Sequence, residues 1–114
     1  MKFHGRIAYV GDVKWFKSKD LEGGRDCYVD VIIEGVGSAR YRILCKLFHQ
    51  EPAEMLSRQW KSESEKLKYC GVFDIDFSVG EKKDIHGTPM YYQSNRLYSW
   101  SFVQPKEPNA YQKQ

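Results

Sequence analysis

Hydrophobic and polar residues alternate along most of the chain, and this alternation is typical of β-strands that bury one face. The pattern predicts strands over residues 2–16, 26–34, 39–48, 67–79 and 89–103. Gly5 and Gly11 interrupt the first of these segments. Glycine inside a strand marks a bulge or a sharp bend, which a strand needs in order to close a small barrel.

The period of the pattern changes over residues 51–61, where we predict a helix. Pro52 suits the first helical turn, and Glu51 and Glu54 suit its positively polarised end. The predicted order is therefore three strands, a helix and two strands. This order indicates an all-β fold, a five-stranded OB barrel with the helix between strands 3 and 4. Another small all-β barrel is the main alternative.

Length and composition limit what such a barrel contains. The 114 residues suit one domain, which we place at residues 1–103, followed by a flexible tail at residues 104–114. Aromatic residues make up 15% of the chain, as eight Tyr, six Phe and three Trp. A core of this size does not easily hold all of these rings, so we expect some of them on a recognition surface.

Charge and cysteine content indicate the compartment in which the protein is expected. The net charge is +3, and residues 1–48 carry it, with nine Lys and Arg against six Asp and Glu. Three cysteines without a Cys-x-x-Cys pair predict buried free thiols in a reducing compartment. The first fifteen positions are too charged for a signal peptide, and no apolar run reaches membrane-spanning length. We therefore expect a cytoplasmic protein that makes no membrane contact.

Catalytic and metal-binding patterns are missing from the sequence. It has no GxSxG, phosphate loop, HExxH or CxxC motif, and its three histidines are not spaced as metal ligands. Asp74 and Asp76 share a strand face and read best as solvent-facing residues, and His49 reads best as a helix-entry residue. We expect a protein that is not an enzyme and has no cofactor and no metal.

Aromatic residues and cations occur together at places that an OB barrel brings to one groove. The outer face of the third predicted strand carries Arg42, Lys46 and Phe48, and Tyr28 lies on the strand before it. Rings stack on unpaired bases and cations contact phosphates, so this combination indicates binding of single-stranded nucleic acid. The residues that we predict from this pattern are Lys14, Trp15, Phe16, Lys17, Arg25, Tyr28, Arg42, Lys46, Phe48, Lys82, Lys83 and Tyr92.

Several of these assignments have a structural alternative. One of Trp15 and Phe16 must face the core, and the alternation of the strand favours Trp15 for that place. Phe48 could cap the barrel beneath the helix, although the cations at its alternate positions favour the groove. Lys82 and Lys83 could belong to an ordinary solvated loop.

The chain resembles the OB-fold single-stranded DNA-binding proteins of bacteria and their phages over roughly residues 3–103. The opening FHGRIAYVGD is similar to the first strand of that family, and YRILCKLFHQEPAEML is similar to its third strand and helix. KLKYCGVFDIDF is similar to the fourth strand with its glycine, and DIHGTPMYY to the last hairpin. The four segments follow the order and spacing of the family.

This resemblance implies DNA binding through aromatic residues on strand faces and assembly into a homo-oligomer, a dimer or a tetramer. Phe48 matches a stacking position of the family, and Arg6 matches a basic position of its first strand, which adds Arg6 to the predicted site. Two features depart from the family. Asp74 and Asp76 occupy a face that is often basic and aromatic, and the C-terminal residues lack the family's acidic, partner-recruiting tip.

The expected function is to coat and protect single-stranded DNA, without strong sequence preference, during replication or recombination. Proteins of replication or recombination are the expected partners. The missing acidic tip makes the chain more similar to a phage or mobile-element form, for which the expected location is the host cytoplasm. An RNA-binding OB domain and a protein-interaction OB domain are the alternatives, because the sequence does not reveal a preference for the 2′-hydroxyl of RNA.

Overall fold

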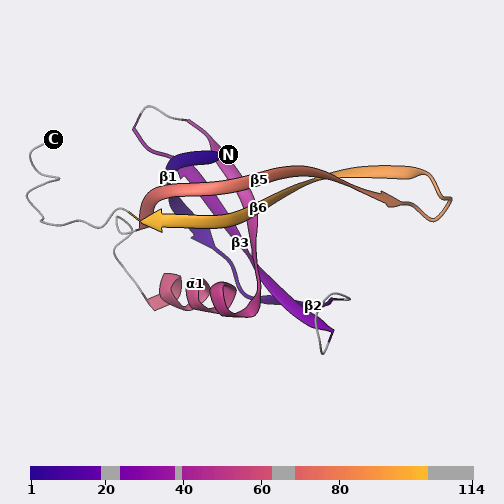
Figure 1. Ribbon diagram of the computed structural model, residues 1–114, viewed down its shortest axis with the longest axis horizontal. Helices are drawn as coiled ribbons and strands as arrows, with labels where there is room; N and C mark the ends of the chain where they lie inside the picture. The colour runs from indigo at the N-terminus through magenta and orange to yellow at the C-terminus, as the bar shows by residue number, and fades with distance from the viewer. Residues whose placement is uncertain (19–23, 38–39, 63–68, 103–114) are drawn as a thin grey trace, which may run out of the picture.

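The computed structural model describes residues 1–18, 24–37, 40–62 and 69–102, which form a mostly β structure with one helix (Figure 1). Its strands are β1 (Lys2–Val10), β2 (Lys14–Lys17), β3 (Arg25–Gly35), β4 (Arg42–Phe48), β5 (Cys70–Lys83) and β6 (Pro89–Phe102). The helix α1 spans Gln50–Ser62, between β4 and β5. The predicted tail at residues 104–114 lies outside the described residues.

The six strands form one sheet that closes on itself. Its order is β1-β5-β6-β4-β3-β2, and an additional pairing of β1 with β3 completes a ring that leaves β2 as an extension on β3. Gly5 and Gly71 are partners where β1 meets β5. A Cβ at Gly5 would overlap the carbonyl oxygen of Glu34, and one at Gly71 would overlap that of Ser101. Glycine therefore permits the close approach of strands that closure requires.

The prediction of five strands, with the helix between strands 3 and 4, is wrong. Residues 2–16 form two strands rather than one, so the helix follows the fourth of six strands. The cause lies in the register against β3, where Val10 pairs with Val31 and Lys14 pairs with Tyr28. Between these two pairs, the first segment has three residues whereas β3 has two. The extra residue interrupts the strand. The amide of Gly11 donates to the carbonyl of Asp30 at 2.8 Å at this point.

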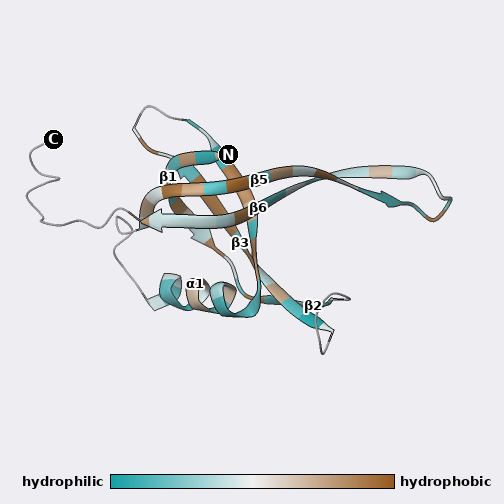
Figure 2. Ribbon diagram, in the orientation of Figure 1, coloured by the Kyte–Doolittle hydropathy of each residue, from teal (hydrophilic) through white to brown (hydrophobic). Residues whose placement is uncertain are grey.

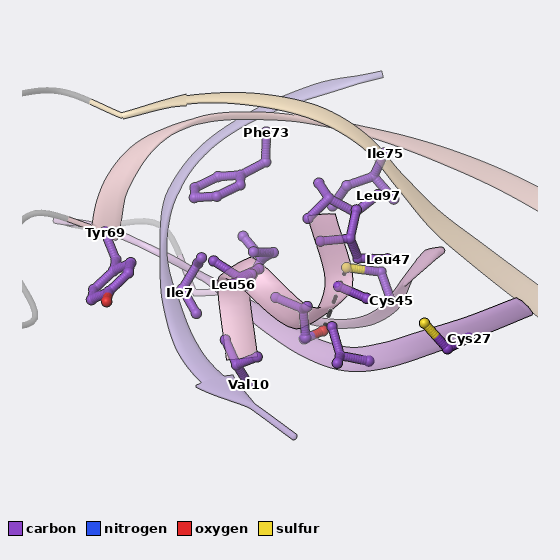
Figure 3. Packing of buried hydrophobic residues seen from close by; sticks show 14 residues of the cluster. Ile7, Val10, Cys27, Cys45, Leu47, Leu56, Tyr69, Phe73, Ile75 and Leu97 are labelled. Atoms are coloured by element: carbon purple, nitrogen blue, oxygen red, sulfur yellow. Dashed lines mark hydrogen bonds between the residues drawn. The ribbon is translucent and has the colours of Figure 1, made fainter. Parts of the chain in front are cut away.

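The core lies inside the ring and beneath α1. Val29, Val31 and Ile33 of β3 are buried, as their alternation predicted, and Phe73 of β5 is the largest fully buried side chain. Leu56 reaches the same cluster from α1 (Figure 3). The strands of the body carry most of the hydrophobic residues, whereas α1 and β2 are largely hydrophilic (Figure 2). Each such side chain contributes about 1.5–3 kcal/mol through burial.

The three cysteines are free thiols, and the structure buries two of them, Cys27 and Cys45. The prediction of buried free thiols is therefore confirmed for these two, whereas Cys70 is only half-buried. Burial raises the pKa of Cys45 to about 12, and its thiol donates to the carbonyl of Val31 at 3.4 Å. A thiol with so high a pKa stays protonated at neutral pH, so Cys45 acts as a small apolar core residue.

β5 and β6 continue beyond the barrel as a two-stranded arm (Figure 1). None of residues 77–95 is buried, and the molecule measures 60 × 32 × 19 Å. At the tip, the carboxylate of Asp84 accepts hydrogen bonds from the amides of His86 and Thr88 at 2.8 and 2.9 Å. The sequence pattern ended the fourth predicted strand at residue 79, but β5 extends farther because its pairing with β6 continues to Lys83 and Pro89.

Candidate nucleic-acid interface

Three aromatic rings from three strands gather on the outer face of the barrel. Phe16 of β2, Tyr28 of β3 and Phe48 of β4 have ring centroids 5.6–6.0 Å apart, and we call these residues the aromatic cluster. Tyr28 is the direct cross-strand partner of Phe48. Side chains of paired residues lie on the same face of a sheet, so the register itself brings these rings together. All three are half-buried and leave part of their surface exposed.

Two lysines flank the aromatic cluster. The ammonium group of Lys46 lies 4.5 Å from the ring centroid of Tyr28, and that of Lys14 lies 5.9 Å from it. Lys14 also donates to a carboxylate oxygen of Asp30 at 3.0 Å, and this hydrogen bond raises the pKa of Lys14. Lys14 is therefore charged at neutral pH, and both ammonium groups stand beside the half-buried ring of Tyr28.

Arg96 brings a third cation to the cluster from β6. The parallel pairing of β4 with β6 places Arg96 opposite Lys46. The guanidinium carbon lies 5.1 Å from the ring centroid of Phe48 and 5.3 Å from that of Tyr98. A guanidinium that contacts two aromatic faces has little freedom left, so its position is fixed before any ligand arrives.

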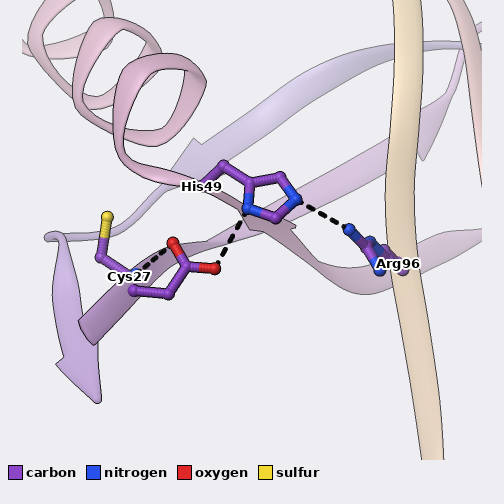
Figure 4. A network of polar contacts seen from close by, with 4 residues as sticks. Cys27, His49 and Arg96 are labelled. Carbon is purple, nitrogen blue, oxygen red and sulfur yellow. Dashed lines mark hydrogen bonds and ion pairs between the residues drawn. The ribbon is translucent and has the colours of Figure 1, made fainter. Parts of the chain in front are cut away.

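A buried carboxylate and a histidine fix Arg96 further (Figure 4). Nη2 of Arg96 lies 3.2 Å from Nε2 of His49, and Nδ1 of His49 lies 3.1 Å from Oδ2 of Asp26. The guanidinium only donates hydrogen bonds, so Nε2 accepts and Nδ1 carries the proton that His49 donates to Asp26. Asp26 is itself buried and accepts from the amide of Cys27 at 2.7 Å.

The backbone of His49 takes a conformation that few residues adopt. Its φ of 83° lies in the left-handed region, where a side chain with a Cβ is strained. The amide of His49 donates to the carbonyl of Cys27 at 3.0 Å, which fixes the chain between β4 and α1. The strained turn directs the imidazole toward both Asp26 and Arg96 (Figure 4). The structure thus retains His49 at the helix entry, as the sequence suggested, and gives it a positioning role.

The chain matches no protein-family model, and no curated protein matches it. Within residues 1–18, 24–37, 40–62 and 69–102, no three His, Cys, Asp or Glu side chains gather closely enough to hold a metal ion. In the same part of the chain, no helix is long and apolar enough to cross a membrane.

Trp15, Lys17 and Arg25 lie on the other side of the ribbon that β2 forms with β3. Trp15 pairs with the buried residue Cys27 rather than with Tyr28, so its side chain points away from the aromatic cluster. It does not enter the core either, because the ribbon extends past the barrel and leaves the indole 43% exposed. The guanidinium carbon of Arg25 lies 5.3 Å from the indole ring. These residues form a second aromatic and basic surface, separate from the cluster.

Arg6 and Arg42 lie at the opposite end of β3 from the cluster. Both contact Glu34, with nitrogen–oxygen distances of 2.6 Å for Arg6 and 3.8 Å for Arg42. Arg42 and Phe48 stand on the same face of β4, six residues apart, which corresponds to about 20 Å along a strand. The two arginines thus extend the basic surface along the barrel, but a carboxylate already partners them.

Lys82, Lys83 and Tyr92 lie on the arm and not beside the cluster. The ring of Tyr92 covers its cross-strand partner Gly80, because glycine leaves room for it. Tyr92 is four residues from Arg96, which corresponds to about 13 Å along β6. The arm is therefore a separate exposed surface, which also carries Val79, Ile85, Met90 and Tyr91.

The sequence pattern did not single out Arg96. Its position beside Phe48 depends on the pairing of β4 with β6, which joins residues 50 positions apart in the chain. One signal was present, because Arg96 lies two residues before Tyr98 and four before Trp100 on an alternating stretch. A single cation at the start of such an aromatic series indicates a ring–cation contact.

Proposed function

We propose that the protein binds single-stranded DNA through the aromatic cluster, without strong sequence preference, and is not an enzyme. The observation that carries this proposal is the arrangement of Phe16, Tyr28 and Phe48 on the outer face of the barrel, with three cations, Lys14, Lys46 and Arg96, over the rings of Tyr28 and Phe48. Replication and recombination expose such DNA, and coating it is the expected role.

The aromatic rings of this surface suit the bases of an unpaired strand, and its cations suit the phosphates. Unpaired bases lose contact with water when they stack on aromatic rings, and this stacking contributes roughly 1–3 kcal/mol per base whatever the base. Lysine and arginine bind the phosphates and release the cations that surround a free strand, so affinity falls as salt rises. Duplex DNA keeps its bases stacked inside the helix and can use only the second of these contributions.

We also propose that the barrel is an OB fold with an interrupted first strand. The order of strands around the ring, the parallel contact of β4 with β6 and the helix directly after β4 support this assignment. β1 and β2 both pair with β3 and can be taken as two halves of one bent strand. On that correspondence, β3 and β4 are the OB strands whose face binds oligonucleotides, and they carry Tyr28, Lys46 and Phe48.

A titration with labelled oligonucleotides tests the proposed function. We expect oligo-dT to bind more tightly than a duplex of the same length, as measured by fluorescence anisotropy. Lys14, Lys46 and Arg96 supply up to three phosphate contacts, so log K should fall with log salt at a slope of about −2, at 0.7 per contact on a single strand. Equal affinity for oligo-dT and duplex would refute single-strand binding, and tighter binding of oligo-rU would reassign the site to RNA.

A further inference from the structure

A hollow of about 260 Å³ adjoins the aromatic cluster, between the end of β4, the start of α1 and β6. Its walls are mostly apolar and aromatic, and they include Leu47, Phe48, Pro52, Leu97, Tyr98 and Trp100. The hollow is smaller than the pockets that hold drug-sized ligands, which begin at about 300 Å³, so it suits a single planar ring system.

The polar lining of the hollow includes the guanidinium of Arg96 and the imidazole of His49. Arg96 lines it, and one of its N–H groups is directed to Nε2 of His49. Nδ1 of His49 is engaged by Asp26, so the imidazole has no acceptor left for a ligand. Arg96 forms no ion pair with its cross-strand partner Asp76 or with another described carboxylate, so its remaining N–H groups are available to a ligand.

We propose that this hollow takes a guanine base from the bound strand, with Arg96 donating to N7 and O6. This proposal rests on the proposed function and adds a preference at one nucleotide. Guanine presents two adjacent acceptors on that edge, which match the fork of a guanidinium, whereas adenine presents an acceptor beside an amino donor. Apolar walls favour a base over a terminal phosphate, because they cannot pair the charge of a phosphate.

Four oligonucleotides that differ at one position test this proposal. Each is an oligo-dT with a 5′-hydroxyl and a central dT, dG, dA or 7-deaza-dG. We expect the dG strand to bind at least about fivefold more tightly than the dA strand, the lower end expected for one bidentate contact. The strand with 7-deaza-dG lacks the N7 acceptor and should bind like the dA strand.

Arg96→Lys is the matched protein variant, because lysine keeps the charge but lacks the fork of two parallel donors. We expect it to bind the dG strand no more tightly than the dA strand, so that the preference for dG is lost. Binding of oligo-dT by wild type without a preference for dG would overturn this inference alone. No binding of oligo-dT would overturn the proposed function as well. A 5′-phosphate that tightens binding as much as dG would assign the hollow to a strand end instead.

Discussion

Phe48→Ala is expected to weaken the binding of oligo-dT by about 5- to 150-fold. This range corresponds to the loss of one stacked base at roughly 1–3 kcal/mol. Phe48 has the central position in the site, with its ring centroid 5.6 Å from that of Tyr28 and 5.1 Å from the guanidinium of Arg96. Its removal therefore takes away a stacking surface and also one of the two rings that hold Arg96. Anisotropy titrations of the variant and wild type measure the change.

Two variants separate stacking from packing in this experiment. Phe48→Leu keeps most of the apolar volume but removes the flat ring, so it should lose most of the same affinity. Met55→Ala removes a side chain of α1 that is 38% exposed and lies outside the aromatic cluster, so it should bind like wild type. An unchanged affinity for Phe48→Ala, together with a collapse of thermal stability, would show that Phe48 serves the core and not the site.

Phe73→Ala is expected to lower the free energy of unfolding by about 3–5 kcal/mol, the range for a large buried aromatic residue. Phe73 is fully buried among the core side chains (Figure 3). Its ring also contacts that of Phe102 on β6, with the centroids 6.2 Å apart. The variant removes packing shared by β5 and β6, and the space that remains cannot fill completely. Urea unfolding followed by circular dichroism gives the free energy.

Phe77→Ala is the matched control, because Phe77 lies four residues farther along the same strand and is 39% exposed. Its ring packs edge-on against that of Phe3 on β1, with the centroids 5.7 Å apart. We expect a clearly smaller loss than for Phe73→Ala, because the aromatic pair contributes about 0.5–1.5 kcal/mol beyond its buried area and much of the ring stays in solvent. Equal losses for the two variants would contradict a core enclosed by the ring of strands and would place the stability of the fold elsewhere.

The faces of the strands could be predicted because a side-chain period of two needs only local information. Val29, Val31 and Ile33 are buried and Tyr28 lies outward, as alternation along β3 predicted. The interruption between β1 and β2 could not be predicted in the same way, although Gly11 marked its place. It arises from one extra residue relative to β3, and that register appears only when the two strands pair.

The residues of the site differ in the same way, because some could be predicted from local sequence and others depend on long-range pairing. Phe16, Tyr28, Lys46 and Phe48 were predicted from ring and cation patterns within single strands, and the structure places them together. The contribution of Arg96 depends on a parallel strand pair and on a strained histidine, neither of which has a local sequence signal.

Trp15 shows that the predicted face of a strand does not by itself determine burial. Alternation favoured the core for it, and Trp15 does share a strand face with the buried residue Cys27, yet it stays 43% exposed because β2 is an extension on β3 outside the ring of strands. A periodic pattern predicts which residues share a face, and only the tertiary structure decides what covers that face.

Side-chain NMR of the protein during titration with oligo-dT tests directly whether unpaired bases occupy the aromatic cluster. We expect the ring resonances of Tyr28 and Phe48 and the Nε–H resonance of Arg96 to shift most and to saturate together, because stacked bases change the magnetic environment within a few ångströms. If these resonances stay in place while the changes gather on α1 or on the arm of β5 and β6, the bases bind elsewhere and the account given for this face is wrong.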